Sequence, residues 1–243
     1  MTRLLAIGAD GARGGWLTAL AYGTSLGDVE RVELQLAADF EALVALRTSA
    51  VPMAVDIPMG LLDTVALRPC DAKARELLGK RASTVFEPAS RPLLSAVSHE
   101  EVRLKTTKAR ETDAAARGLS VQAYGIVPKM READRFLQAN PEAQEWLWEV
   151  HPELSFWAMP EGKVLRSKTS VGGVGERLKL LCDRFPGVVE ALIAFEPGNR
   201  DAQMPDALDA LVCLDTALHV ATDDSEEFGG ETDSTGLAMR MVV

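Results

Sequence analysis

The chain has 243 residues, 47% of them hydrophobic and 26% charged, a globular composition that excludes a disordered chain, a collagen-like repeat and a coiled-coil rod. Its three cysteines form no Cys-x-x-Cys pair, which argues against a disulfide framework or a thiolate zinc site and favours the reducing cytoplasm. No run of about 18 apolar residues occurs, so no membrane span is expected. The formal net charge is −10, so the overall charge does not attract nucleic acid.

The first 60 residues predict a strand-rich unit with one helix. Apolar runs at residues 4–8, 16–22 and 29–36 are separated by short turns, which is typical of an antiparallel meander. Residues 39–47 have helical apolar spacing, and residues 53–57 form a buried strand closed by Pro58 and Gly60. This order predicts an α/β sheet whose fourth strand is parallel to the first.

The rest of the chain is mainly helical. Ser98 and Glu101 form a capping-box pattern that predicts a helix to about residue 117, and Pro128 bends or breaks a later one. The other expected elements are helices at 71–80, 120–139, 177–185 and 206–221, strands at 146–150 and 237–243, and a solvated acidic loop at 223–233. The simplest organisation is a single α/β domain over 1–243 with a helical insertion at about 65–140.

The insertion is basic within an acidic protein. Residues 68–135 contain 14 Lys and Arg against 9 Asp and Glu, a local charge of +5. Such a segment is either an electrostatic footprint for a polyanion or a solvated helical face, and composition alone favours neither.

Three carboxylates interrupt runs that otherwise read as buried strands: Asp10, Asp56 and Glu149. Burying a charge is costly unless it is paired or bound to a metal. A single case would be a structural ion pair, but three on separate strands favour a shared site. Two carboxylates about 4 Å apart repel by about 4 kcal/mol at an effective dielectric of 20, and a divalent cation offsets this. Oxygen ligands indicate Mg²⁺ or Mn²⁺.

A later helix offers a fourth contributor. Asp206 and Asp209 lie three residues apart, and Pro205 helps to start their helix. Acids in a first helical turn also complement the helix dipole. Because Leu208 and Leu211 predict packing against the sheet, Asp209 is the one expected at the strand ends.

Five blocks together resemble predicted ribonuclease-H-like nucleases of an uncharacterised domain family. They are Ile-Gly-Ala-Asp10-Gly-Ala-Arg-Gly-Gly-Trp16, Ala-Val-Asp56-Ile-Pro-Met-Gly-Leu61, Arg68-Pro-Cys-Asp71-x-x-Ala-Arg75, Glu149-Val-His-Pro-Glu153-Leu-Ser-Phe156 and Asp206-Ala-Leu-Asp209-Ala. The resemblance covers nearly the whole chain. It implies a ribonuclease-H-like mixed sheet of three antiparallel strands followed by parallel strands, flanked by helices. It also implies that Asp10, Asp56 and Asp209, with Glu149 as a fourth, hold the catalytic metals.

Four further residues are candidates for substrate binding. Lys80 and Arg81 follow a helix end, Lys129 lies beside Pro128, and His151 follows Glu149 by two. Each also has an ordinary structural explanation: the cations complement a helix dipole, and the histidine forms a structural hydrogen bond. The segment around Gly79 lacks the spacing of a Walker motif.

The leading hypothesis is a divalent-metal-dependent phosphodiester hydrolase, a nuclease that uses Mg²⁺ or Mn²⁺ and acts on DNA or RNA. The alternatives are an actin-like ATP-binding phosphotransferase, for which the glycine-rich turn at 11–15 would hold phosphate, and a non-catalytic binding protein that retains the fold.

Overall fold

The computed structural model describes residues 1–160, 162–196 and 201–243. The strands are β1 (Arg3–Ala12), β2 (Gly15–Ser25), β3 (Asp28–Ala37), β4 (Met53–Asp56), β5 (Leu147–Glu149), β6 (Glu227–Thr232) and β7 (Ala238–Val242). The α-helices are α1 (Phe40–Ala45), α2 (Pro69–Leu78), α3 (His99–Ala109), α4 (Val121–Gly125), α5 (Val127–Ala139), α6 (Pro152–Ala158), α7 (Val171–Arg184), α8 (Val188–Ala194) and α9 (Met204–Ala221). Short 3-10 helices occupy Gly79–Thr84, Arg91–Leu93 and Pro141–Glu145.

A five-stranded mixed sheet in the order β3-β2-β1-β4-β5 forms the centre of the molecule. The first three strands pair antiparallel, whereas β4 lies parallel to β1 and β5 lies parallel to β4. The protein therefore has the α/β fold with a mixed sheet and flanking helices that the element order predicts. The carboxyl ends of β1, β4 and β5 meet at one edge, which is where ligands bind in open α/β sheets.

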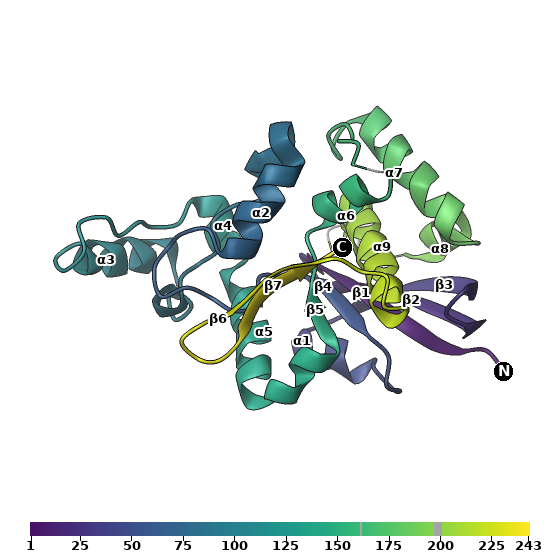
Figure 1. Ribbon diagram of the computed structural model, residues 1–243, viewed down its shortest axis with the longest axis horizontal. Coiled ribbons are helices and arrows are strands. Elements are labelled where there is room, and N and C mark those ends of the chain that lie inside the picture. Colours follow the sequence, from purple (N-terminus) through teal and green to yellow (C-terminus); the bar gives the residue numbers. More distant parts are fainter. Residues whose placement is uncertain (161, 197–200) are drawn as a thin grey trace.

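Helices cover both faces of this sheet (Figure 1). Helix α9 packs on β1, β2 and β4, and it is buried on nearly every side from Ala207 to Leu218. Helices α1 and α5 pack together against the other face, where α1 begins at Asp39, whose side chain accepts from the amide of Ala42. Gly8 permits the close approach of α9, because a Cβ there would lie 2.1 Å from the amide nitrogen of Leu214.

The segment between β4 and β5 is helical, and α3 projects from the body of the protein at the left of Figure 1. The expected helix to residue 117 is wrong, since α3 ends at Ala109. Beyond it the side chain of Asp113 accepts from the amide of Ala115, and Arg110 Nε donates to the carbonyl of Ala116. Such local side-chain bonds compete with continued helix.

The acidic segment near the C-terminus also differs from the expectation. Residues 223–233 do not form only a solvated loop, because Glu227–Thr232 is strand β6, which pairs antiparallel with β7. Phe228 is the one buried residue of β6, so the segment has no apolar pattern and its partner strand determines its conformation. Helices α6 and α8, of seven residues each, were not expected.

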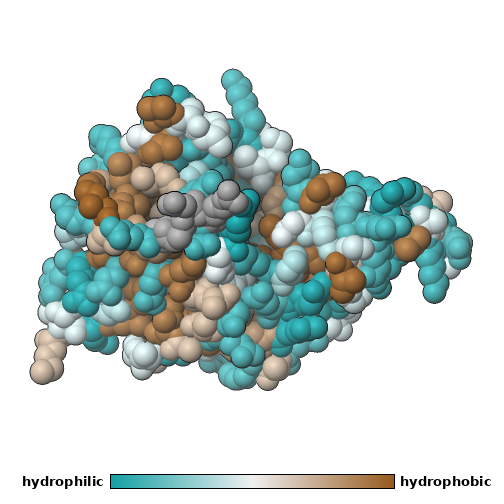
Figure 2. Space-filling model, turned by 180° about the vertical axis from the view of Figure 1, so that it is seen from behind, coloured by the Kyte–Doolittle hydropathy of each residue, from teal (hydrophilic) through white to brown (hydrophobic). Residues whose placement is uncertain are grey.

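Apolar side chains gather on the left of the back view in Figure 2, at the end of the molecule that carries α7 and α8. Val189 and Ile193 of α8 are among the exposed ones. Within the part of the chain that the structure describes, every helix is too short or too polar to cross a membrane.

Candidate active site

Asp10 and Asp56 lie side by side on the sheet. They are paired residues of the parallel strands β1 and β4, and paired positions of neighbouring strands direct their side chains to the same face. Gly8 lies two residues before Asp10, so this is the face on which α9 packs. Asp10 is only 8% exposed, in agreement with its position in an apolar run. The structure thus brings together two of the predicted site residues.

Helix α9 adds Asp209 to this face. Its side chain is buried, and it accepts a hydrogen bond from Lys168 Nζ in the loop between α6 and α7. The side chain of Lys168 is 38% exposed, so its ammonium connects the buried carboxylate to solvent. Asp206 instead caps α9, where it accepts from the amide of Gln203. Of the two acids in this turn, Asp209 belongs to the site.

The pKa values of the three aspartates are raised. Burial is the main cause in all three; the charges of neighbouring acids add to the shifts of Asp10 and Asp56, whereas Lys168 opposes the shift of Asp209. The pKa of Asp10 lies well above its ordinary value, that of Asp56 is about 8 and that of Asp209 is about 6. A side-chain hydrogen bond from Asp10 favours the ionised form of Asp56 and so partly opposes the rise in its pKa. Burial opposes the charge of Lys168, but Asp209 raises its pKa overall.

Glu149 lies beside these strands but has different partners. It pairs with Val55, one residue before Asp56, so its side chain leaves the opposite face of the sheet. Its two oxygens accept from Arg68 at 2.5 and 2.7 Å, and the amide of Met59 donates to it at 2.7 Å. Burial raises its pKa to about 7, although Arg68 opposes the shift. Glu149 is therefore held in an ion pair on the opposite face of the sheet from the aspartates, and the convergence of all four acids on a metal stays a prediction.

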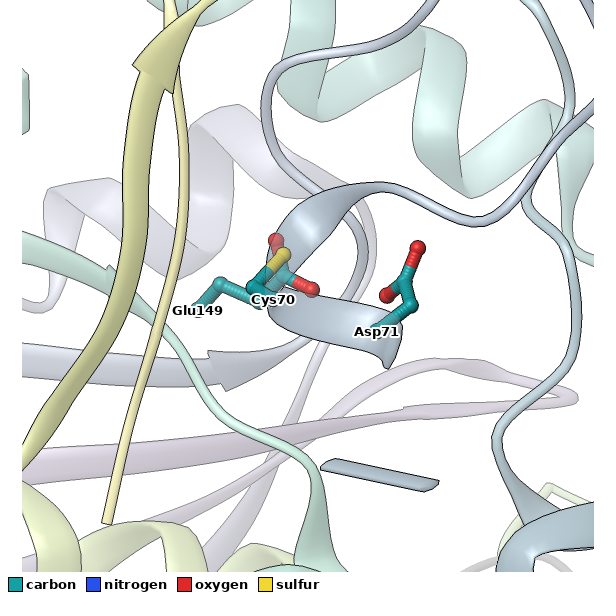
Figure 3. A group of neighbouring side chains, drawn as sticks. All are labelled: Cys70, Asp71 and Glu149. Atoms are coloured by element: carbon teal, nitrogen blue, oxygen red, sulfur yellow. The ribbon is translucent and has the colours of Figure 1, made fainter. Parts of the chain in front are cut away.

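Cys70, Asp71 and Glu149 form the tightest set of metal-ligand side chains among the described residues (Figure 3). Their ligand atoms all lie within 4.8 Å of one another, and this buried cluster could hold a metal ion. Arg68, which is 1% exposed, already bonds to both carboxylates. An ion here would have to displace the guanidinium, and burial raises the pKa of the Cys70 thiol, which opposes the thiolate form that ligates metal. The three aspartates are a looser set, with an exposed cation beside them.

A cavity of about 470 Å³ opens at this edge of the sheet. Asp56, Asp209 and Glu149 line it together with Lys168, so acids from both faces of the sheet reach the same space. Asp56 and Asp209 thus border a hollow large enough for a small molecule, because such sites usually measure about 300–1,000 Å³, while Asp10 lies beside Asp56 and does not line it.

The predicted cations occupy different positions. Arg81 lines the cavity, and its Nη2 donates to Glu153 at 3.0 Å. Lys80 is exposed and does not line it. Lys129 approaches Asp10 from the α5 side, where its ammonium donates to the carbonyl of Gly15 at 2.5 Å and lies 4.5 Å from the ring centroid of Trp16. Lys129 therefore has structural partners.

His151 lines the cavity as well. Its Nε2 contacts the carbonyl of Thr84 at 3.3 Å, and this contact makes Nε2 the donor. Burial lowers the pKa of His151, so the ring is neutral and Nδ1 is an acceptor. Nδ1 is buried and has no partner among the described residues.

A family model described as a protein of unknown function, DUF429, matches residues 8–234 of the chain. The protein belongs to the DUF429 family. No curated protein and no solved structure matches it. Membership in DUF429 establishes an uncharacterised domain that includes the whole site, and the chemistry has to be argued from the residues.

Sequence reasoning missed three members of this DUF429 site. Lys168 lies in a polar loop without any periodic pattern. Arg68 precedes Pro69 at the start of α2, and its spacing of three from Asp71 was the one available signal. Arg177 is fully buried on α7 and donates to Glu153 at 2.8 Å, whereas the sequence indicated it only as the first residue of an expected helix.

Proposed function

We propose that this protein is a divalent-metal-dependent phosphodiester hydrolase, a nuclease of ribonuclease-H-like fold. The strand order β3-β2-β1-β4-β5, with three antiparallel strands followed by two parallel ones, supports the fold that the sequence blocks imply. A late helix that carries an acid to the ends of β1 and β4 supports it further. Fold alone does not decide function, so the argument for hydrolysis depends on the site.

The observation that carries the proposal is the pair formed by Asp10 and Asp56. The carboxyl groups of buried Asp10 and half-buried Asp56 lie side by side on adjacent strands, both with raised pKa values, and Asp209 adds a third acid. A fold retains such repulsion where a cation offsets it. The donors are all carboxylate oxygens, which fit Mg²⁺ or Mn²⁺ better than a soft metal. Asp10, Asp56 and Asp209 would hold the ion, which supplies an acidified water and charge stabilisation at the leaving oxygen.

The remaining groups of the site have roles that do not depend on the ion. Lys168 donates to Asp209, and the ammonium of this half-buried side chain has further N–H groups that can donate to a phosphoryl oxygen. The guanidinium of Arg68 donates to a carboxylate oxygen of Glu149 and to one of Asp71, each at 2.7 Å. These bonds fix the end of β5 and the start of α2 beside the cavity. The cavity wall is therefore rigid where a scissile group would lie.

The actin-like alternative receives less support. In the turn between β1 and β2, the amide of Gly14 already donates to the carbonyl of Asp201 at 2.8 Å, and the carbonyl of Gly15 accepts from Lys129. These backbone groups therefore have partners within the protein, and the amide of Gly14 is not free to bind a phosphate.

Hydrolysis of labelled single-stranded and double-stranded DNA and RNA with Mg²⁺ or Mn²⁺ tests the proposal. We expect cleavage that EDTA abolishes and that Asp56→Asn reduces at least about 100-fold, since removing one group that acts on the transition state costs about 2.7–4 kcal/mol. Asp215→Asn is the control, because Asp215 is a buried aspartate of α9 that does not line the cavity and pairs with Arg184. Cleavage that survives Asp56→Asn, or no cleavage with either metal, would contradict the proposal.

A further inference from the structure

The second wall of the cavity offers groups that bind anions. Facing the same space as Asp56 and Asp209 are guanidinium, ammonium and hydroxyl groups, contributed by Arg81, Thr84, Ser167, Lys168 and Thr169. They come from the 3-10 helix after α2 and from the loop before α7. The cavity lining therefore combines carboxylates with cationic and hydroxyl-bearing side chains, and the latter set is called the wall below.

Arg81 has unused hydrogen-bonding capacity. Its Nη2 donates to Glu153, and Nη1 has no acceptor among the described residues. Its Nε is buried and likewise has no partner there. Glu153 also pairs with Arg177 at 2.8 Å, so one carboxylate faces two guanidinium groups and one positive charge remains. Arg81 is 25% exposed and is thus the cation through which that charge reaches the cavity.

The hydroxyls beside it are similarly placed. The Oγ of Ser167 and the Oγ1 of Thr169 lie 2.9 Å apart, and one proton of such a pair serves the contact while the other is left for a ligand. Lys168 lies between them in the chain and bonds to Asp209. The same short loop therefore joins the anion-binding wall to the acids.

The basic insertion, by contrast, presents less charge outside than its composition indicates. Several buried or half-buried cations donate to partners within the protein, among them Arg68, Arg75, Arg91, Lys129 and Arg131. These contacts hold the side chains against the protein and make them less available to a long polyanion, whose neutralised phosphates are the main source of affinity for duplex nucleic acid. Recognition of phosphate is thus concentrated inside a cavity of about 470 Å³.

We infer that the cavity binds a phosphodiester next to a terminal phosphomonoester, with the phosphomonoester against Arg81, Ser167 and Thr169 and the diester at the aspartates. The substrate is then a phosphorylated dinucleotide or the phosphorylated end of a single strand, which share this chemistry. The assignment of the diester rests on the proposed hydrolase function, whereas the phosphomonoester site depends on the cavity wall alone. His151 Nδ1, an acceptor in the same wall, suits a sugar hydroxyl.

Calorimetric titration with metal chelated by EDTA tests the phosphomonoester site without hydrolysis. The probes are thymidine dinucleotides with a 5′-phosphate, with a 3′-phosphate and with neither. We expect one phosphorylated form to bind about tenfold or more tightly than the unphosphorylated one, as befits a charge-assisted hydrogen bond. Equal affinity for all three dinucleotides would overturn the inference.

Two variants assign the effect to the wall. Arg81→Gln should remove the preference for the phosphorylated dinucleotide, whereas Lys80→Gln, the same charge change at the exposed neighbour, should retain it. Thr169→Val, on a different segment, should weaken that preference by about threefold or more, so the test stands even if Arg81→Gln does not fold. A preference that persists in both Arg81→Gln and Thr169→Val would refute the inference.

Strands of 20 nucleotides separate the two sources of the ligand and the two proposals. Binding of a phosphorylated linear strand but not of a circular one indicates that the ligand is a chain end. Binding of the dinucleotide alone indicates a small substrate. Either result supports the inference, whereas equal binding of the linear and the circular strand overturns it. Cleavage without any end preference would leave the hydrolase proposal standing and refute this one. A preference for the phosphorylated end without cleavage in Mg²⁺ or Mn²⁺ would support this inference and contradict the hydrolase proposal.

Discussion

Asp10→Asn should stabilise the metal-free protein, because it removes the acid whose ionisation the fold opposes most clearly. Burial and the charges of Asp56 and Asp209 raise the pKa of Asp10 well above its ordinary value of 3.8. Asn has nearly the same shape, and its amide can still donate to Asp56. The substitution therefore removes the electrostatic cost and leaves the packing unchanged.

The magnitude follows from proton linkage. A carboxyl whose pKa is raised on folding contributes stability that is present below the unfolded pKa and is lost as pH rises towards the folded pKa. Between pH 3.8 and the folded pKa of Asp10, wild type loses about 1.4 kcal/mol per pH unit relative to a variant that does not titrate. At pH 7 this gives about 4 kcal/mol as an upper limit. At about 2–4 °C per kcal/mol, this limit corresponds to a rise in melting temperature of at most about 8–16 °C.

Thermal and chemical denaturation in EDTA at pH 6, 7 and 8 measure this difference. We expect the advantage of Asp10→Asn to grow with pH, while Asp215→Asn gains nothing because Asp215 has a cation partner in Arg184. Mg²⁺ or Mn²⁺ should raise the melting temperature of wild type, by about 2.7 kcal/mol of stability at a hundredfold excess over Kd, and raise that of Asp10→Asn less. A variant that melts below wild type in EDTA, or a difference independent of pH, would refute the reasoning.

Two other substitutions test the cations of the site. Lys168→Met should destabilise the metal-free protein at pH 8 and increase its response to Mg²⁺, because Lys168 bonds to Asp209 and its charge favours ionisation of the aspartates. Melting temperatures measured with and without metal test this, and an unchanged metal response would contradict it. Arg68→Gln should lower the free energy of unfolding by about 3–5 kcal/mol, because it leaves buried Glu149 and Asp71 without their cation. The control in the same denaturant titration is Lys73→Gln, which removes an exposed ion pair with Glu76 worth about 0–1 kcal/mol. If both substitutions lowered the free energy of unfolding equally, the ion pairs of Arg68 would not be important for stability.

The sequence by itself determined the central sheet and two of its acids. The apolar runs around Asp10 and Asp56 predicted buried strands, because burial of side chains on both faces leaves an uninterrupted apolar pattern that an acid visibly breaks. Helix α9 was equally clear, since Pro205 and Asp206 mark its start and apolar residues continue for four turns. These signals are local, so a single segment is enough to reveal them.

Only the tertiary structure decided which charges meet. Lys168 and Asp209 are 41 residues apart, and Arg68 and Glu149 are 81 apart; no local pattern encodes either contact. The sequence placed Glu149 with the aspartates because it too interrupts a strand, but the register of β5 against β4 turns its side chain to the other face. A shift of one residue in a strand reverses the face of every side chain, and only the packing of neighbouring elements fixes that register.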